Sequence, residues 1–79
     1  MKNRSNIELV AVLLEAFLSP SNKTRAMYDA KVSYLQLSNY LDMLQEKKLV
    51  TNTENGMWVV TDEGREYVHA YRAIKEIII

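Results

Sequence analysis

Apolar residues recur at helical spacing between residues 33 and 47. With spacings of i, i+3, i+4 and i+7, they are Tyr34, Leu37, Tyr40, Leu41 and Leu44. This pattern predicts an amphipathic helix that buries one face. Ser33 lies just before it and can accept a hydrogen bond from a first-turn N–H, so Ser33 is the predicted N-cap. The opposite, mostly polar face carries Leu35, Gln36, Ser38, Asn39, Asp42 and Met43.

The residues before this helix predict a shorter one, from about Thr24 to Asp29, with Thr24 as its N-cap. Its small inward-facing set is Ala26, Met27 and Ala30. Residues 30–32 then form a tight turn. Two helices joined in this way predict a helix-turn-helix, which places the polar face of its second helix in the DNA major groove. The alternative is an ordinary solvent-exposed face on a packed helix.

A broad apolar stripe predicts another helix at the N-terminal side of this pair. It consists of Ile7, Val10, Leu13, Leu14, Phe17 and Leu18. Ser5 or Asn6 is the expected N-cap, and Pro20 marks the end because proline disfavours helix in the residue before it. Leu9 and Val12 fall outside the stripe. They indicate either a second contact surface or scattered exposed apolar residues.

The last third of the chain predicts a hairpin and a final helix. Two β-favouring runs, 49–51 and 57–60, flank a turn that ends in Asn-Gly, a strong hairpin signal. Thr61 is the expected N-cap of a helix that continues to the C-terminus. Within it, Tyr67, Tyr71, Ile74 and Ile78 have the 4, 3, 4 spacing of a coiled-coil seam. Ala70 and Ile77 widen that seam.

The order helix, helix, helix, hairpin, helix is that of a winged helix. We therefore predict an α+β, mostly helical fold: a winged helix-turn-helix with three helices, a two-stranded wing and a C-terminal helix. Residues 1–79 are expected to form a single domain, in which residues 62–79 are a helix suited to dimerisation.

Short motifs along the chain agree with this order. They are Lys23-Thr24, Met27-Tyr28, Ser33-Tyr34, Gln36-Leu37, Tyr40-Leu41, Leu44, Leu49-Val50 and Thr61-Asp62-Glu63-Gly64. Together, over about residues 5–75, they resemble the archaeal winged-helix family of small chromatin-associated proteins and predicted transcription regulators. The resemblance implies DNA binding. It also implies dimerisation, because family members with a long C-terminal helix pair through it as an antiparallel coiled coil; the last helix of this chain is shorter.

The chain departs from the family pattern at three places. Ala26 stands where isoleucine is usual, and Lys31-Val32 replaces asparagine-leucine. Lys48 stands where glycine is common, before the first wing strand. We expect none of these changes to disturb the fold.

Charge permits a nucleic-acid partner without requiring one. Ten basic and ten acidic residues cancel, but residues 1–53 carry seven basic against five acidic side chains, a net charge of +2.

The sequence contains no cysteine and no apolar run of membrane-spanning length. It also shows no secretory pattern, because Glu8 and Glu15 interrupt the first apolar segment. A cytoplasmic protein is therefore expected, associated with the nucleoid if it binds DNA.

No catalytic constellation is evident. His69 is the single histidine and has no cysteine or second histidine with which to bind a metal, so we expect it on a solvent-exposed helix face. The two glycines form no phosphate-binding loop. The chain is therefore predicted not to be an enzyme and to need no cofactor, metal or small-molecule substrate.

For double-stranded DNA the candidate residues divide into two roles. Phosphate contacts are expected from Lys23, Thr24, Arg25, Lys31, Lys47 and Lys48, with Lys2 and Arg4 in a polar N-terminal arm. Base contacts are expected from Ser33, Gln36, Ser38 and Asn39, since Gln and Asn can pair bidentately with adenine. Tyr34 is expected to pack under the turn.

Two features favour a different function. Asp42 and Glu46 lie on the outer face of the helix predicted between residues 33 and 47. The wing tip holds Glu54 but no Lys or Arg. A winged helix that serves only as a protein–protein interaction module is therefore the alternative to a dimeric DNA-binding transcription regulator or chromatin-associated protein. Trp58, on the second strand, is expected to be a core or interface aromatic.

The end of the last helix is crowded with apolar residues that a small core cannot all cover. We predict a homodimer whose interface includes Leu9, Val12, Tyr71, Ile74, Ile77 and Ile78. The competing arrangement folds the isoleucines back onto their own domain.

Overall fold

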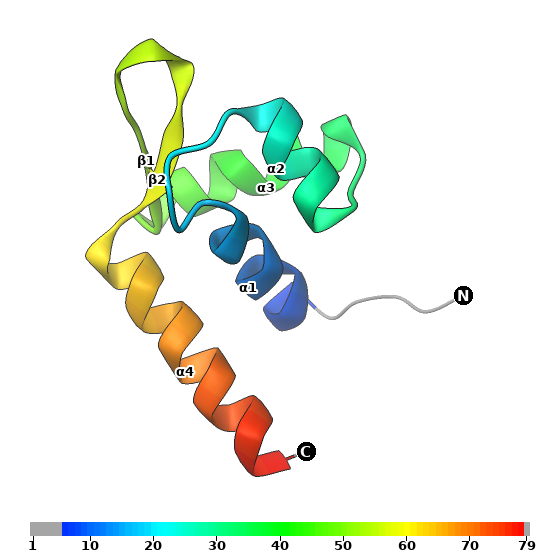
Figure 1. Cartoon of the computed structure of the whole chain (residues 1–79), viewed down its shortest axis with the longest axis vertical. Coiled ribbons are helices and arrows are strands. Elements are labelled where there is room, and N and C mark those ends of the chain that lie inside the picture. The colour runs from blue at the N-terminus through cyan, green and yellow to red at the C-terminus, as the bar shows by residue number, and fades with distance from the viewer. Residues whose placement is uncertain (1–5, 79) are drawn as a thin grey trace.

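The computed structural model describes residues 6–78 of the chain (Figure 1). Its elements are α1 (Asn6–Ala16), α2 (Lys23–Ala30), α3 (Tyr34–Glu46), β1 (Val50–Asn52), the single-turn 3-10 helix η1 (Glu54–Gly56), β2 (Trp58–Val60) and α4 (Asp62–Ile78). The predicted winged helix-turn-helix is confirmed, mostly helical with a two-stranded antiparallel wing. Lys2, Arg4 and Ser5, the predicted arm and cap residues, lie outside the described residues.

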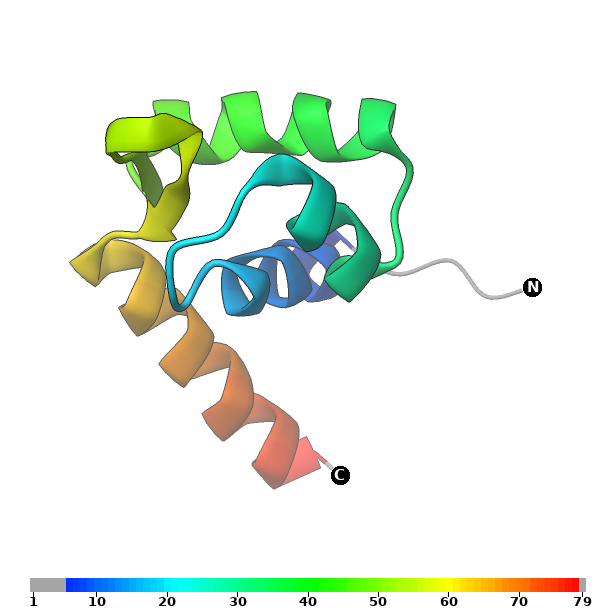
Figure 2. The ribbon, with the colours of Figure 1, turned by 45° about the horizontal axis from the view of Figure 1, so that its top comes forward.

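The helices pack around one core. Helix α1 packs against both α2 and α4, and α2 packs against α3. Helix α3 runs along one edge of the molecule, with the wing beside its C-terminal end (Figure 2). Within the described residues, no other element crosses the outer side of α3 (Figure 2). The fold therefore leaves one face of α3 open to a partner.

Of the four predicted helix caps, two are confirmed. The Ser33 hydroxyl accepts a hydrogen bond of 3.1 Å from the Gln36 N–H, and the Thr61 hydroxyl accepts one of 3.1 Å from the Gly64 N–H. The prediction for Thr24 is wrong, because Asn22 caps α2 and accepts a bond of 2.8 Å from the first-turn N–H of residue 25. Asparagine ranks above threonine as an N-cap, so the helix begins one residue earlier than predicted.

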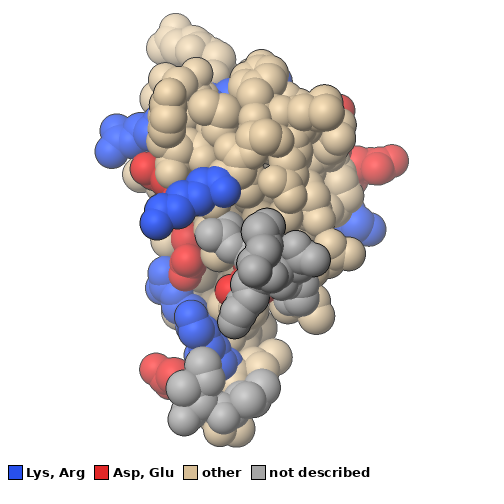
Figure 3. Space-filling model, turned by 90° about the vertical axis from the view of Figure 1, so that its right-hand side faces the viewer, with Lys and Arg blue, Asp and Glu red and all other residues tan. Residues whose placement is uncertain are grey.

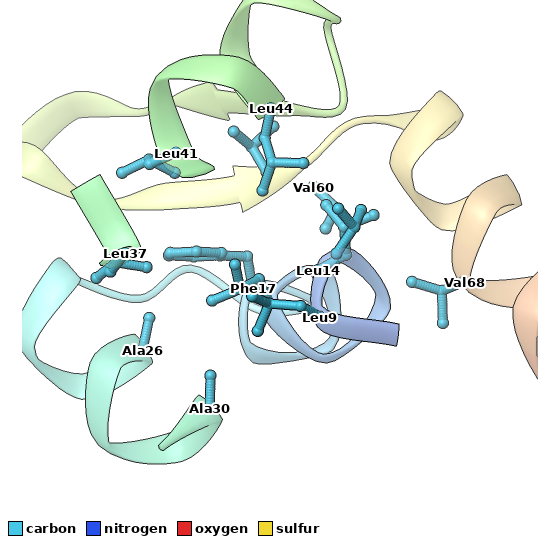
Figure 4. Packing of buried hydrophobic residues seen from close by; sticks show 13 residues of the cluster. Leu9, Leu14, Phe17, Ala26, Ala30, Leu37, Leu41, Leu44, Val60 and Val68 are labelled. Atoms are coloured by element: carbon cyan, nitrogen blue, oxygen red, sulfur yellow. The ribbon is translucent and has the colours of Figure 1, made fainter. Parts of the chain in front are cut away.

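Phe17, which is fully buried, lies at the centre of the core, where α1, α2, α3 and the wing converge (Figure 4). Its surroundings include Ala26, Ala30, Leu37, Leu41, Leu44, Val60 and Val68. The two alanines confirm the predicted inward face of α2. Because their side chains are small, the α2 backbone can lie close to the rest of the core. The α3 leucines confirm the predicted buried face of that helix.

The predicted stripe of α1 is partly wrong. Leu9, expected outside it, is only 4% exposed, whereas Ile7, expected within it, is 64% exposed. Val12 is half-buried against the core. The physical reason is that α1 is covered by α2 on one side and by α4 on another, so its buried face is wider than a single stripe.

The wing is a short hairpin with a five-residue connection, 53–57. The strands pair antiparallel in the register Val50↔Val60, Thr51↔Val59 and Asn52↔Trp58. Asn55 and Gly56 both adopt positive φ, 71° and 69°, which explains why Asn-Gly signals the turn. The predicted hairpin is thus confirmed, with a longer loop than a two-residue turn.

A link that the sequence did not predict fastens the wing to the helices. The Ser21 N–H donates to the Trp58 carbonyl at 3.0 Å, and the Trp58 N–H donates to the Ser21 carbonyl at 2.9 Å. The segment between α1 and α2 therefore borders β2 as an isolated antiparallel bridge. This bridge fixes the wing relative to the helix-turn-helix.

The start of α4 is packed tightly against the end of α3. A Cβ atom at Gly64 would collide with the carbonyl oxygen of Leu49 and come within 3.2 Å of the Val60 Cβ. The Thr61 hydroxyl also donates to the Lys48 carbonyl at 2.6 Å. Glycine is therefore required here for close approach of two backbone segments, not for its conformational freedom.

Further along α4, contact with the rest of the molecule decreases. Val68 is buried, and the Tyr67 hydroxyl donates to the Ile7 carbonyl of α1 at 3.1 Å. Burial raises the pKa of Tyr67, with a further contribution from neighbouring Tyr71, so the phenol stays a donor. The last turns extend beyond α1 (Figures 1 and 2), with Ile74 55% and Ile77 83% exposed.

Candidate nucleic-acid interface

Three leucines of α3 are buried against the core. The opposite side of α3 is therefore exposed to solvent, and this side is the open face. Its outermost line, with the helical spacing 4, 3, 4, consists of Leu35, Asn39, Asp42 and Glu46, all exposed. Gln36 is exposed beside this line, while Ser38 is half-buried on the other flank. The Ser33 oxygen already accepts the capping bond, so its hydroxyl proton and one remaining lone pair are available to a ligand.

Lys23 lies where α2, α3 and the wing meet. Its Nζ is 5.9 Å from the centre of the Tyr34 ring and 6.0 Å from that of the Trp58 ring. Both distances are at the outer limit of a cation–π contact. Tyr34 is 54% exposed, so the prediction that it packs under the turn is wrong: at the first residue of α3 the core is already closed by Leu37. Trp58 is half-buried against the core, as expected.

Thr24 and Arg25 are exposed on the first turn of α2. The Arg25 Nε is 3.9 Å from the Asp29 Oδ2, but both side chains are more than half exposed, 77% and 53%. Exposed pairs of this kind are weak and screened by salt. Arg25 is therefore available to another anion.

Lysines flank both ends of α3. Lys31 follows α2 directly before the start of α3, and Lys47 and Lys48 follow its last residue; all three are exposed. Lys31 and Lys48 adopt left-handed backbone conformations, with φ of 59° and 63°. Asparagine and glycine tolerate positive φ better than lysine does. Both lysines therefore adopt this backbone conformation at an energetic cost.

Helix α3 itself, Tyr34–Glu46, contains no Lys or Arg. Its only charged residues, Asp42 and Glu46, lie in its C-terminal half. The wing strands and their connection likewise lack basic residues and expose Glu54 at the tip. Viewed from the side of the α2–α3 turn, the upper half of the molecule is mostly uncharged, with both basic and acidic side chains near its margins (Figure 3). The candidate interface is thus a ridge that is neutral in its N-terminal half, acidic at Asp42 and Glu46, and flanked by lysines at both ends.

Other chemistry finds little support in the part of the chain that is described. His69 is exposed on α4, as predicted. Residues 6–78 contain no group of three or more His, Cys, Asp or Glu side chains arranged to hold a metal ion. Nor does any helix among them have the length and apolarity needed to cross a membrane.

These features define a winged helix-turn-helix, and the sequence agrees: the family profile described as "Winged helix-turn-helix" matches residues 3–78. The chain belongs to this family. None of the curated proteins compared with it matches at a significant level.

Solved structures share the fold. Sso10a-2, a DNA-binding protein from Sulfolobus solfataricus, superposes with a TM-score of 0.83 at 23% identity, over 94% of this chain and 81% of that one. Wild-type ZitR of Lactococcus lactis gives a TM-score of 0.74 at 16% identity over 96% of this chain. A second ZitR structure, described as a zinc-responsive MarR family member, gives 0.63 at 23% identity over 96%. This chain spans only 54% and 56% of the two ZitR chains.

Proposed function

We propose that this chain is a DNA-binding protein, a transcription regulator or a chromatin-associated protein, that acts as a cytoplasmic homodimer. The observation that carries the proposal is the open outer face of α3, with exposed lysines at both of its ends. A major groove accommodates one α-helix, and side chains at the ends of that helix come near the flanking phosphates. The winged helix-turn-helix fold and the family membership support the same placement of α3 in the groove.

Two sets of side chains have separate roles in this proposal. Phosphates are bound by Lys23, Thr24, Arg25, Lys31, Lys47 and Lys48, which fix the protein on the duplex without reading its sequence. Base edges are read by Gln36 and Asn39, with smaller contributions from the Ser33 hydroxyl and half-buried Ser38. The acidic wing tip stays away from phosphates.

The dimer in this proposal pairs the exposed ends of α4. Ile74 and Ile77 are exposed, Tyr71 is half-buried, and Ile78 continues the helix. Leu9 is buried in its own chain and is therefore no longer part of the proposed interface. Val12 is half-buried, so only part of its side chain could contact the partner. Pairing through α4 leaves α3 of each protomer free for a half-site.

DNA binding is tested by gel shift on random-sequence duplexes over a series of salt concentrations. Lys31→Gln and Lys48→Gln should each weaken binding across all sequences, and each should lower the slope of log K against log salt by about 0.9, the value for one phosphate contact. Lys75→Gln removes the same charge from the far part of α4 and should leave the slope unchanged. Equal slopes in all four proteins would contradict the proposed phosphate contacts.

The alternative function is a protein–protein interaction module. It is favoured by one observation: Tyr28 and Leu35, on either side of the α2–α3 turn, are each 71% exposed. Aromatic and aliphatic side chains exposed together are typical of a protein contact. Absence of any salt-dependent DNA binding by the wild-type protein would select this alternative.

A further inference from the structure

Leu35 is the most exposed large hydrophobic side chain of α3. It is the second residue of α3, is 71% exposed, and lies one helical turn before Asn39 on the outermost line. An aliphatic side chain left in water forgoes the stabilisation that burial would provide. Because Leu35 lies at the N-terminal end of the outermost line, it is an apolar group that a surface approaching this face would contact.

The neighbours of Leu35 favour one kind of base pair. The commonest specific contact to guanine comes from Arg or Lys, and α3 contains neither. Gln36 and Asn39, both exposed, have the amide groups that pair with the N6 and N7 atoms of adenine. Each adenine is paired with a thymine whose C5-methyl group projects into the same groove, where it matches an apolar side chain.

Charge decides which part of α3 enters the groove. Asp42 lies seven residues beyond Leu35, about 10 Å further along the helix axis, and Glu46 follows at the end. Carboxylates close to the phosphates would be repelled. The N-terminal half, which is neutral and has Lys31 just before it, is therefore the half that approaches the bases most closely.

We infer that the N-terminal half of α3 recognises A·T base pairs in the major groove, with Leu35 in contact with the methyl group of thymine and Gln36 and Asn39 on adenine. This inference rests on the proposed DNA-binding function and names the bases that it reads. Leu35 is then a specificity-determining residue, and its exposure in the free protein is the cost of a contact that forms only on DNA.

The contact is tested by replacing thymine with uracil, which lacks only the methyl group. Short random-sequence duplexes are made by primer extension with either dTTP or dUTP, and the affinity of each protein for the two pools is compared at one salt concentration. Wild type should bind the thymine pool about three- to fivefold more tightly for each methyl group contacted, as expected for burial of one methyl-sized group. Leu35→Ala should bind both pools equally, with an unchanged salt slope.

A matched control separates this contact from a general effect of shortening an exposed aliphatic side chain. Ile7→Ala shortens another exposed aliphatic, 64% exposed on α1, and should keep the thymine preference of wild type. The inference is overturned if wild type and Leu35→Ala show the same ratio between the two pools while both bind DNA. If wild type binds neither pool, the proposed function itself fails, and the inference fails with it.

Discussion

Lys31 and Lys48 illustrate how a single residue can conflict with its backbone. Both adopt positive φ, a region that costs a residue with a Cβ atom about 1–2 kcal/mol. A strained conformation occupied by the same residue type at both ends of α3 suggests that the side chain is retained for its charge. The two positions carry exposed ammonium groups just where the proposed phosphate contacts lie.

Lys48→Gly should stabilise the protein. The change relieves the left-handed strain but increases the backbone freedom of the unfolded chain, so we expect a net gain of about 0.5–1 kcal/mol in the free energy of unfolding, measured by urea denaturation. Lys47→Gly is the matched control, because Lys47 has an ordinary φ of −85°. Lys47→Gly removes the same charge and should lower the free energy of unfolding. Equal effects of the two changes would show that φ at Lys48 carries no strain.

At the scale of the elements, the helix-turn-helix and the wing are joined by backbone contacts as well as by the core. The Ser21–Trp58 bridge links the α1–α2 segment to β2, and the Thr61 hydroxyl bonds to the carbonyl that follows α3. Leu49 lies under the first turn of α4. These contacts hold the wing and α4 at a fixed orientation to α3. The position of the open face of α3 relative to the wing and α4 is therefore fixed as well.

Gly64→Ala tests this close approach. Alanine favours helix over glycine by about 1 kcal/mol, so propensity alone would stabilise α4. The new Cβ would instead collide with the Leu49 carbonyl, and we expect a net loss of about 1–3 kcal/mol in the free energy of unfolding, as for overpacked sites. His69→Ala, on the exposed face of the same helix, should change it by less than about 0.5 kcal/mol. A Gly64→Ala protein as stable as wild type would show that the two segments separate easily.

At the scale of the whole molecule, α4 is the element with unused apolar surface. Its first half is anchored to α1 by Val68 and by the Tyr67–Ile7 hydrogen bond, and an ion pair of 3.0 Å joins Arg72 to Glu15. Beyond that pair, Ile74 and Ile77 remain exposed. The competing arrangement, in which the isoleucines fold back onto their own domain, is therefore wrong for these two residues.

Sedimentation decides whether this surface forms a dimer. We expect wild type to sediment as a dimer at tens of micromolar, and Ile74→Glu with Ile77→Glu to sediment as a folded monomer, because two carboxylates would be desolvated in the interface. Glu66→Lys with His69→Glu, a double charge change on the exposed face of the first half of α4, should leave the dimer intact. A monomeric wild type would remove the dimer and the paired half-sites.

Local patterns in the sequence determined most of the elements. Periodicity located the helices, Asn-Gly located the wing turn, and Ser33 and Thr61 were correctly predicted as caps, because each of these depends on residues within one or two turns of the chain. The exposed positions of Gln36 and Asn39 followed from the same helical geometry. Their roles on DNA stay predictions.

Contacts between distant segments were decided only by the tertiary structure. Leu9 is buried because α1 is covered on more than one side by other elements, and no pattern within α1 records those neighbours. Asparagine is the better N-cap type, but the choice of Asn22 over Thr24 also depends on the extended conformation of the chain at Asn22, beside the Ser21–Trp58 bridge. The strain at Lys48 and the collision at Gly64 likewise depend on how α3, the wing and α4 meet, since burial and backbone conformation there are set by partners far away in the sequence.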